Sequence, residues 1–220
     1  MSLRPNLGQN LGQNPGRNAG EPTADQRILE LACAHLRQYG PRRATIVGIA
    51  EAAGMSHANV YRYFPSKEAL FDAVALLWLK PLEQQLHVIV QGPDPAYDKL
   101  ERALTALQHA YRHKRDSDPV LFRLLCKAFE NSDGLARRHR NRVQGEIQAI
   151  VEEGIASGAF RIQDRRRAMA LVFDLAHRFV HPVSIALDKD ISPADMEFRA
   201  GRAIAVIQRS LTYGDPDFDM

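Results

Sequence analysis

The stretch Thr45–Phe64, TIVGIAEAAGMSHANVYRYF, decides the fold of this chain. Its first apolar residues recur at the spacing of one helix face, and this pattern stops at Gly54. A second short helix is predicted from Ser56, a favourable N-cap residue, to Phe64. Two short helices joined by a glycine-containing turn form the helix-turn-helix pattern, so the sequence predicts a DNA-binding motif here.

The second of these helices offers side chains suited to the major groove, which is about 12 Å wide and admits a helix that is polar on one side. Asn59 has the amide that bonds adenine at two atoms, and the small Ala58 permits close approach. Val60 and Phe64 are expected to face back into the domain. The hydroxyls and cations around this helix suit phosphate oxygens. The residues predicted to contact DNA are Arg43, Thr45, Ser56, His57, Ala58, Asn59, Tyr61, Arg62, Tyr63 and Lys67.

Four of these assignments have a plainer structural alternative. Tyr61 and Tyr63 are core aromatics in that alternative, but Lys67 and the preceding turn lie in register with them, which favours phosphate contact. Asn59 is equally well explained as a solvated helix residue. His57 lies near the start of the second helix, so we expect it to face DNA rather than the core.

Helical patterns continue along the rest of the chain, and neither alternating strand patterns nor Asn-Gly hairpins occur. The helix before the motif is expected to end at Gly40-Pro41, and the helix that Ser66 caps is expected to kink or end at Pro81. The sequence therefore predicts an all-α fold, with a compact unit of short helices, a connecting helix and a larger bundle. In that bundle one helix is predicted from about residue 135 to 156, and others start at the capping residues Asp94, Asp118, Asp164 and Ser192.

The composition is that of an ordinary globular protein, with 45% apolar and 25% charged residues among 220. Residues 1–21 are instead rich in Gly, Asn and Gln, and are predicted to be a disordered tail rather than a secretory signal. No stretch approaches about eighteen consecutive apolar residues, so no transmembrane helix is expected. Cys33 and Cys126 are expected to be buried thiols in a reducing cytoplasm, with a redox switch as the alternative. The net charge of +3 permits contact with a polyanion without requiring it.

Residues 22–82 resemble the DNA-binding domain of the tetracycline-repressor (TetR) family of one-component regulators. The resemblance rests on ILELACAHLRQYG before the motif, on AGMS at the turn, and above all on the run VYRYFPSKEAL from Val60 to Leu70. The sequence departs from the family pattern in two places. Gly48 replaces a polar helix former and should loosen the helix that contains it slightly. Ala58-Asn59 replaces Gly followed by Thr or Ser, so an operator borrowed from relatives is unsafe.

The resemblance implies a homodimer in which each recognition helix reads one half of a palindromic double-stranded DNA operator. It also implies a C-terminal helical domain that binds a small-molecule effector, dimerises through its last two long helices, and shifts the separation of the two DNA-binding heads. The domains are then expected at 1–21 (disordered tail), 22–82 (helix-turn-helix) and 83–215 (effector binding and dimerisation). The candidate pocket residues, each of which is otherwise a plain core residue, are Trp78, Tyr111, Phe122, Phe129, Phe173 and His177.

Two histidine pairs, His109 with His113 and His177 with His181, have the i, i+4 spacing that places two imidazoles on one helix face. Asp174 would add a carboxylate to the second pair. No His-Glu-x-x-His pattern occurs, and such pairs are more often polar-face residues. We therefore predict neither a metal nor a cofactor.

Basic runs occur at residues 137–140 and 165–167. They suggest a second nucleic-acid surface, but glutamates at positions 146, 152 and 153 lie nearby. A charged helix face in contact with solvent is therefore the better interpretation of both runs.

These features together predict a cytoplasmic, ligand-responsive transcriptional regulator, in the first instance a repressor that a small-molecule effector releases from DNA. The alternative is an effector-independent regulator whose C-terminal bundle binds another protein. An enzyme is not expected, because the sequence holds no Gly-x-Ser-x-Gly elbow, no phosphate-binding glycine loop and no catalytic-metal motif. No membrane partner is expected either.

Overall fold

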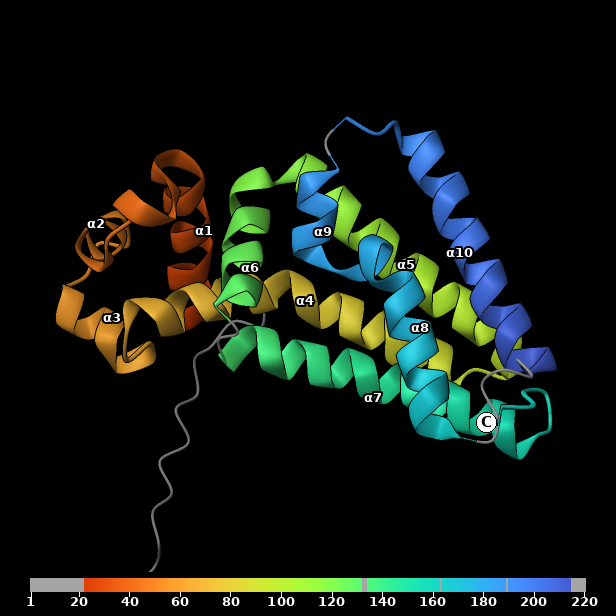
Figure 1. Ribbon diagram of the computed structural model, residues 1–220. Helices are drawn as coiled ribbons and strands as arrows, with labels where there is room; N and C mark the ends of the chain where they lie inside the picture. Colours follow the sequence, from red (N-terminus) through yellow and green to blue (C-terminus); the bar gives the residue numbers. More distant parts are fainter. Residues whose placement is uncertain (1–21, 132–133, 163, 189, 215–220) are drawn as a thin grey trace, which may run out of the picture.

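The computed structural model describes residues 22–131, 134–162, 164–188 and 190–214, and all regular secondary structure in this part of the chain is α-helical (Figure 1). The predicted all-α fold, with a helix-turn-helix unit followed by a helical domain, is confirmed. The predicted tail of residues 1–21 lies outside the described residues. The helices of the described part are α1 (Ala24–Arg43), α2 (Ile46–Ala52), α3 (His57–Tyr63), α4 (Lys67–Gln91), α5 (Ala96–Ser117), α6 (Pro119–Glu130), α7 (Gly134–Ala156), α8 (Arg165–Val180), α9 (Pro182–Leu187) and α10 (Pro193–Tyr213).

The N-terminal unit consists of α1, α2, α3 and the first turns of α4, which share one apolar core. α1 contains a break at Gly40, whose φ of 73° and ψ of 163° depart from helical values, and Pro41 follows it. The predicted end of the first regular helix is thus confirmed. The side chains of this core include Ile28, Leu36, Ile49, Val60, Leu70 and Val74.

Polar caps start the helices where the sequence predicted them. The side-chain oxygens of Thr45, Ser56 and Ser66 accept hydrogen bonds from the backbone N–H three residues on, at 3.1, 3.3 and 3.0 Å. Each bond satisfies one of the N–H groups that a helix start leaves without a partner. The same device starts α6, α8 and α10, at Asp118, Asp164 and Ser192.

Two helix boundaries differ from the prediction. α4 continues through Pro81, because the leucines on either side are buried against neighbouring helices and this packing outweighs the lost hydrogen bond. Asp94 does not cap α5. The N-cap residue is Pro95, and the Asp94 carboxylate accepts a hydrogen bond from Arg102 instead.

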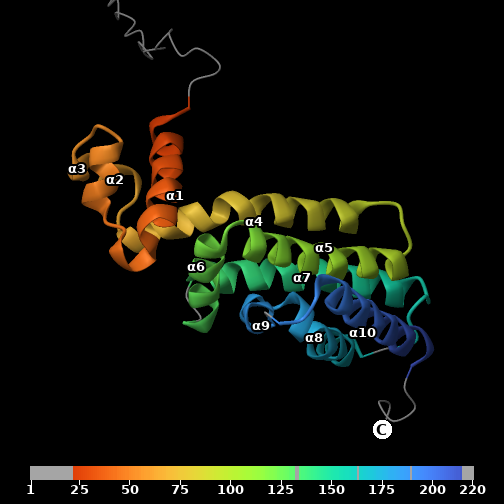
Figure 2. The ribbon, with the colours of Figure 1, turned by 90° about the horizontal axis from the view of Figure 1, so that it is seen from above.

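The C-terminal helices form a bundle around a second, larger core. α5 and α7 lie between the second half of α4 and the pair α8 and α10 (Figure 2). Pro182 separates α8 from α9, as predicted. α6 packs against α1 as well as against the bundle, and its Leu121 is buried in the N-terminal core. α6 therefore connects the two parts of the molecule.

Both cysteines are free and buried, as expected. Cys33 lies in the N-terminal core and Cys126 in the larger one. Burial raises the pKa of both thiols, to about 11 for Cys126. The thiols therefore stay protonated at neutral pH, which disfavours a redox role.

One described stretch, Arg165–Leu187, is long and apolar enough by composition to pass as a membrane span, with a mean hydropathy of 1.3 in its best window. The structure divides this stretch into α8 and α9 and packs it against α5, α6, α7 and α10. One such stretch is weak evidence for a membrane span, since other apolar helices pass the same test. Only 22% of the window is buried, and Leu175 and Leu187 are the exposed large apolar side chains of the described stretch.

Candidate nucleic-acid interface and effector region

The turn between α2 and α3 depends on Gly54, whose φ of 66° lies in the left-handed region that favours glycine. The Met55 N–H then bonds the Ala50 carbonyl at 3.0 Å and closes the end of α2. On the inner side of α3, Val60 and Phe64 are buried, as predicted. α3 is therefore held by one face, and its other face is left to solvent at one end of the molecule (Figure 1).

The outer face of α3 and the residues around it carry the predicted DNA contacts. Tyr61 and Tyr63 are 43% and 46% exposed, so the alternative that they are core aromatics is wrong. Asn59 and Lys67 are half-buried. The other predicted residues are all exposed, namely Arg43, Thr45, Ser56, His57, Ala58 and Arg62.

Several polar groups of this face have no partner within the described part of the chain. No hydrogen bond or ion pair engages the side chains of Tyr61, Arg62 or Tyr63 there; the Tyr61 ring meets only the His57 ring, edge-on at 6.4 Å. The Lys67 ammonium lies 5.3 Å from the centroid of the ring one turn later in α4, which holds it at the start of that helix. Donors without internal partners suit phosphate oxygens.

Thr45 and Ser56 have a second role beside the predicted one. Each hydroxyl oxygen already accepts a hydrogen bond from its own helix start. A hydroxyl can accept and donate at once, so both retain a hydrogen to donate to a phosphate. The cap bond also restricts the rotamer of each side chain.

Gly48 has a packing role that the sequence did not reveal. A Cβ at this position would lie 2.7 Å from Cε1 of His35 on α1 and 3.3 Å from the Thr45 hydroxyl. The missing side chain lets the imidazole lie directly against α2. The centroid of this ring lies 4.5 Å from that of Tyr39, with the two planes tilted by 52°. The expected loosening of α2 is thus offset by a close contact between α1 and α2.

One ion pair joins the N-terminal unit to the C-terminal bundle. Arg37 on α1 donates from Nη2 and Nε to Oδ2 of Asp118, at 2.8 and 3.1 Å, and Lys114 Nζ lies 3.2 Å from the same oxygen. Although burial opposes ionisation, these bonds and one from the Leu121 N–H hold the pKa of Asp118 below its ordinary value. The sequence identified Asp118 as a cap but not its partner, because 81 residues separate the two.

Four of the six predicted pocket residues belong to a chain of ring contacts through the bundle. Phe122 and Phe173 lie in the same hydrophobic core but make none of these ring contacts. His177 is the last ring of the series and is exposed at the surface. The chain runs Trp78, Tyr111, His139, Phe129, His181, His177, with successive centroid separations of 6.3, 6.1, 6.3, 5.3 and 4.5 Å.

His139 is the member that sequence reasoning missed. It belongs to the basic run 137–140, which was expected to face solvent, but it is buried. The Tyr111 hydroxyl lies 2.6 Å from its Nε2, and its Nδ1 lies 2.7 Å from Oε1 of Glu83. If Tyr111 donates to Nε2, the N–H at Nδ1 donates to the carboxylate, and both ring nitrogens are satisfied. The helical period places His139 on the inner face of α7, and this period could have predicted its burial from the sequence.

The histidine pairs have different environments. His177 stacks on His181 with an interplanar angle of 18°. His109 lies 3.7 Å from Glu197, a glutamate of α10. Within the described residues, no group of three or more His, Cys, Asp or Glu side chains has the geometry to hold a metal ion.

The fold and the exposed recognition helix define a class, the helix-turn-helix DNA-binding proteins with a helical C-terminal domain. Residues 28–74 match the family model described as bacterial regulatory proteins, tetR family. Residues 96–199 match the model for the tetracyclin repressor-like C-terminal domain. The chain belongs to the TetR family of transcriptional regulators, and it is a DNA-binding regulator.

Individual relatives agree with this assignment. The HTH-type transcriptional regulator YhgD of Bacillus subtilis, itself uncharacterized, is 26% identical over 180 residues, which cover 74% of this chain and 87% of YhgD. The HTH-type transcriptional repressor KstR2 of Mycolicibacterium smegmatis is 24% identical over 196 residues, or 86% and 91% of the two chains. The structure of the ketosteroid transcriptional regulator KstR2 of Mycobacterium tuberculosis shares the fold, with a TM-score of 0.55, 21% identity and coverage of 88% and 97%.

Proposed function

We propose that this protein is a cytoplasmic repressor that binds a palindromic operator as a homodimer and is released by a small-molecule effector. The observation that carries the proposal is that α3 has one buried apolar side and one exposed polar side. Its apolar side is buried under Val60 and Phe64, and its outer side presents exposed hydroxyl, imidazole and guanidinium groups. These groups are the predicted readers of the operator, and the residues from Arg43 to Lys67 around them are the predicted phosphate contacts.

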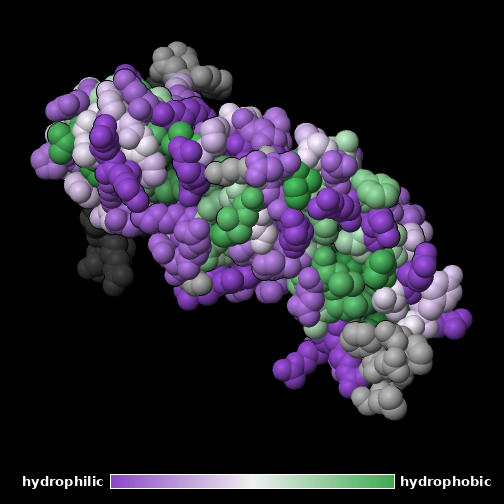
Figure 3. Space-filling model, turned by 45° about the horizontal axis from the view of Figure 1, so that its top comes forward, coloured by the Kyte–Doolittle hydropathy of each residue, from purple (hydrophilic) through white to green (hydrophobic). Residues whose placement is uncertain are grey.

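The proposed dimer forms through α8 and α10. These two helices pack on each other and keep large apolar side chains exposed, namely Leu175, Phe198, Val206 and Tyr213. Figure 3 shows hydrophobic surface gathered at the end of the molecule away from the helix-turn-helix unit. Covering this surface with a second copy would remove apolar area from water, and in the proposed dimer the two copies of α3 read half-sites about 34 Å apart.

The proposed effector binds in the C-terminal bundle, where Trp78, Tyr111, Phe122, Phe129, Phe173 and His177 are the predicted lining residues. Two buried polar atoms support an internal ligand beside them, because Trp78 Nε1 and His181 Nδ1 have no hydrogen-bond partner in the described part of the chain. A buried donor or acceptor without a partner is costly, and a bound molecule can supply one.

The proposed route from the bundle to α3 runs through α6. This helix contacts α9 and α7 on one side and α1 on the other, and its cap Asp118 holds Arg37 of α1. An effector that prefers one position of α6 would therefore also favour one position of the DNA-binding unit.

Selection of operators from random double-stranded DNA, followed by footprinting, tests the DNA-binding part of the proposal. We expect a two-fold symmetric site with half-sites about one helical turn apart, and an affinity that falls steeply with salt. The double variant Tyr61→Phe with Lys67→Ala should bind roughly tenfold more weakly, with the slope of log affinity against log salt reduced by about one. Its matched control, Tyr97→Phe with Lys127→Ala, changes the same residue types in the bundle and should bind normally. Unchanged binding by the first variant would show that these contacts are wrongly assigned.

The dimer is tested by light scattering on the eluting protein. Phe198→Glu places a charge in the proposed interface, so this variant should elute as a monomer and lose operator binding. Leu77→Glu changes an exposed leucine on α4 and should remain dimeric. A dimeric Phe198→Glu protein would contradict the interface.

A further inference from the structure

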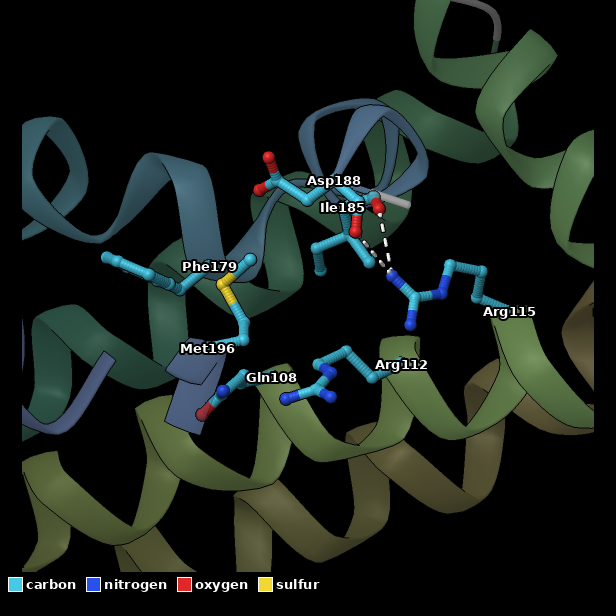
Figure 4. Close-up of a pocket in the computed structure, with 7 residues that line it drawn as sticks. All are labelled: Gln108, Arg112, Arg115, Phe179, Ile185, Asp188 and Met196. Carbon is cyan, nitrogen blue, oxygen red and sulfur yellow. Dashed lines mark hydrogen bonds between the residues drawn. The ribbon is translucent and has the colours of Figure 1, made fainter. Parts of the chain in front are cut away.

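Three polar side chains on α5 line a pocket that none of the predicted effector residues reaches. Gln108, Arg112 and Arg115 are spaced i, i+4 and i+7, so they share one face of the helix. Opposite them lie Phe179 of α8, Ile185 and Asp188 at the end of α9, and Met196 of α10 (Figure 4). Together with the solvent at its opening, the space between these walls is about 180 Å³, and little of it is enclosed.

Two of the charges at this pocket are already used within the protein. Arg115 Nη1 donates to the backbone carbonyls of Ile185 and Asp188, both at 3.3 Å, and its Nε donates to Asp116. The Asp188 carboxylate accepts two hydrogen bonds from Arg178, at 2.6 and 3.1 Å. Arg115 therefore holds the end of α9, and the acidic group of the pocket is neutralised.

The charge that remains is that of Arg112. Its Nη1 donates to the Pro193 carbonyl at 3.2 Å, but its Nε is buried without a hydrogen-bond partner, and no carboxylate of the described residues lies within ion-pair distance. Beside it, Gln108 is only 2% exposed and its Nε2 also lacks a partner among the described residues. Buried donors are normally paired. Two such donors from adjacent turns of one helix leave a place for an acceptor between them.

We propose that this pocket binds the carboxylate of a small organic acid, and that this acid is the effector. The inference rests on the proposed function, whose effector it identifies by class and assigns to this pocket in place of the predicted lining around Trp78. A planar carboxylate matches the guanidinium fork and the neighbouring amide, and its single negative charge matches the Arg112 cation, which no carboxylate of the described residues pairs. A phosphate dianion would leave excess negative charge in a site with apolar walls. The enclosed part of the pocket has room for a group little larger than a water molecule, so the carboxylate enters it and the rest of the acid lies at the opening.

The position of the pocket gives the acid a means of regulation. It binds between α5 and the segment that runs from α9 into α10, and α9 packs on α6. Asp118, which holds Arg37 of the DNA-binding unit, lies less than one turn beyond Arg115. A carboxylate that draws Arg112 and Gln108 toward itself shifts α5 against α9, and so acts directly on the start of α6.

Calorimetric titration of the full-length protein without DNA tests the site. The probes are benzoate and hexanoate, with benzamide and hexanamide as uncharged controls of the same shape. We expect at least one acid to bind with a dissociation constant of about 1 mM or tighter, and its amide to bind at least about tenfold more weakly. Arg112→Met should weaken acid binding by about tenfold or more. Gln108→Glu keeps the side-chain shape and supplies an internal carboxylate to Arg112, so it should abolish acid binding. Arg123→Met, a change at an exposed arginine of α6, should bind the acid as the unaltered protein does.

Three results would overturn the inference. These are failure of both acids to bind at about 10 mM, equal binding of acid and amide, and normal acid binding by a folded Gln108→Glu protein, whose helicity is checked by circular dichroism. The effector assignment also requires that the bound acid lower operator affinity, and an acid that binds without doing so overturns it. Failure of the proposed function is separate, because it shows as absent operator binding when no acid is present.

Discussion

The Arg37 guanidinium and the Asp118 carboxylate form an ion pair, with 2.8 Å between Nη2 and Oδ2, across the junction of the N-terminal unit and the bundle. The same carboxylate caps α6 by accepting from the Leu121 N–H at 3.3 Å. One side chain therefore both starts α6 and ties it to α1. Its two roles can be separated by mutation.

Asp118→Asn keeps a capping oxygen but removes the charge. We expect the free energy of unfolding at pH 7 to fall by about 1 kcal/mol, because the hydrogen bonds to Arg37 and Lys114 lose their ionic acceptor. The folded state lowers the pKa of Asp118. The difference in free energy of unfolding between the unaltered protein and Asp118→Asn is therefore complete above the unfolded-state pKa of about 3.9, and it is lost as pH falls through the lower pKa of the folded state. Urea unfolding between about pH 7 and pH 3 measures both effects.

The control for this comparison is Asp116→Asn. Its carboxylate pairs with Arg115 at the surface and is 58% exposed, so the substitution should change the free energy of unfolding by less than about 0.5 kcal/mol. If the free energies of unfolding of Asp118→Asn and the unaltered protein still differ at acid pH, the charge of Asp118 is not the cause of the difference.

The buried contact between Tyr111 and His139 gives a second prediction. Tyr111→Phe leaves His139 Nε2 buried without a donor, so the free energy of unfolding should fall by about 1–3 kcal/mol. Tyr97→Phe removes a hydroxyl from a 41% exposed ring and should change it by less than about 0.5 kcal/mol. Equal losses in the two variants, measured by denaturant unfolding, would mean that the buried hydrogen bond does not stabilise the bundle.

The sequence predicted what depends on neighbours along the chain. Ser66 and Asp164 cap their helices because a cap needs only the next turn, and Gly40 breaks α1 for the same local reason. Pro81 was expected to kink or end its helix. It does not end it, because the leucines on either side are buried against other helices, which the local pattern does not contain. In the candidate site, Val60 and Phe64 are one helical turn apart, so the sequence predicted that they face the core and that the opposite face of α3 is exposed.

The remaining features depend on which helices meet. Glu83 and His139 are 56 residues apart, and their contact exists only because α4 packs against α7. The same holds for the pocket at Arg112, whose walls come from α5, α8, α9 and α10. A sequence shows that aromatic and polar residues are available in the bundle, but it does not show which of them leave buried donors without partners.

The contact of Gly48 with His35 gives a third prediction. In the His35→Ala background, Gly48→Ala should raise the free energy of unfolding by about 1 kcal/mol, because alanine is the better helix former. In the unaltered protein the new Cβ would lie 2.7 Å from the imidazole, which must move, so the gain should be less than half as large. A double-mutant cycle by thermal unfolding measures this coupling. Equal gains in both backgrounds would contradict the close approach of α1 and α2.

Gly154 and Gly145 on α7 give the last prediction, because they differ in what surrounds them. A Cβ at Gly154 would lie 2.1 Å from Cδ2 of Phe160, a fully buried ring that folds back over the end of the helix. A Cβ at Gly145 would meet nothing within 4 Å. Gly145→Ala should therefore raise the free energy of unfolding by up to about 1 kcal/mol, the helix-propensity gain.

Gly154→Ala should lower it by about 1–3 kcal/mol, since the displaced ring costs more than the helix gains. Gly154→Ala in a Phe160→Leu background tests the cause directly, because the smaller side chain leaves room for the methyl group and the penalty should shrink. Chemical denaturation of the unaltered protein, Gly145→Ala, Gly154→Ala, Phe160→Leu and the double variant measures these differences. A penalty of the same size in the Phe160→Leu background would exclude the ring as its source.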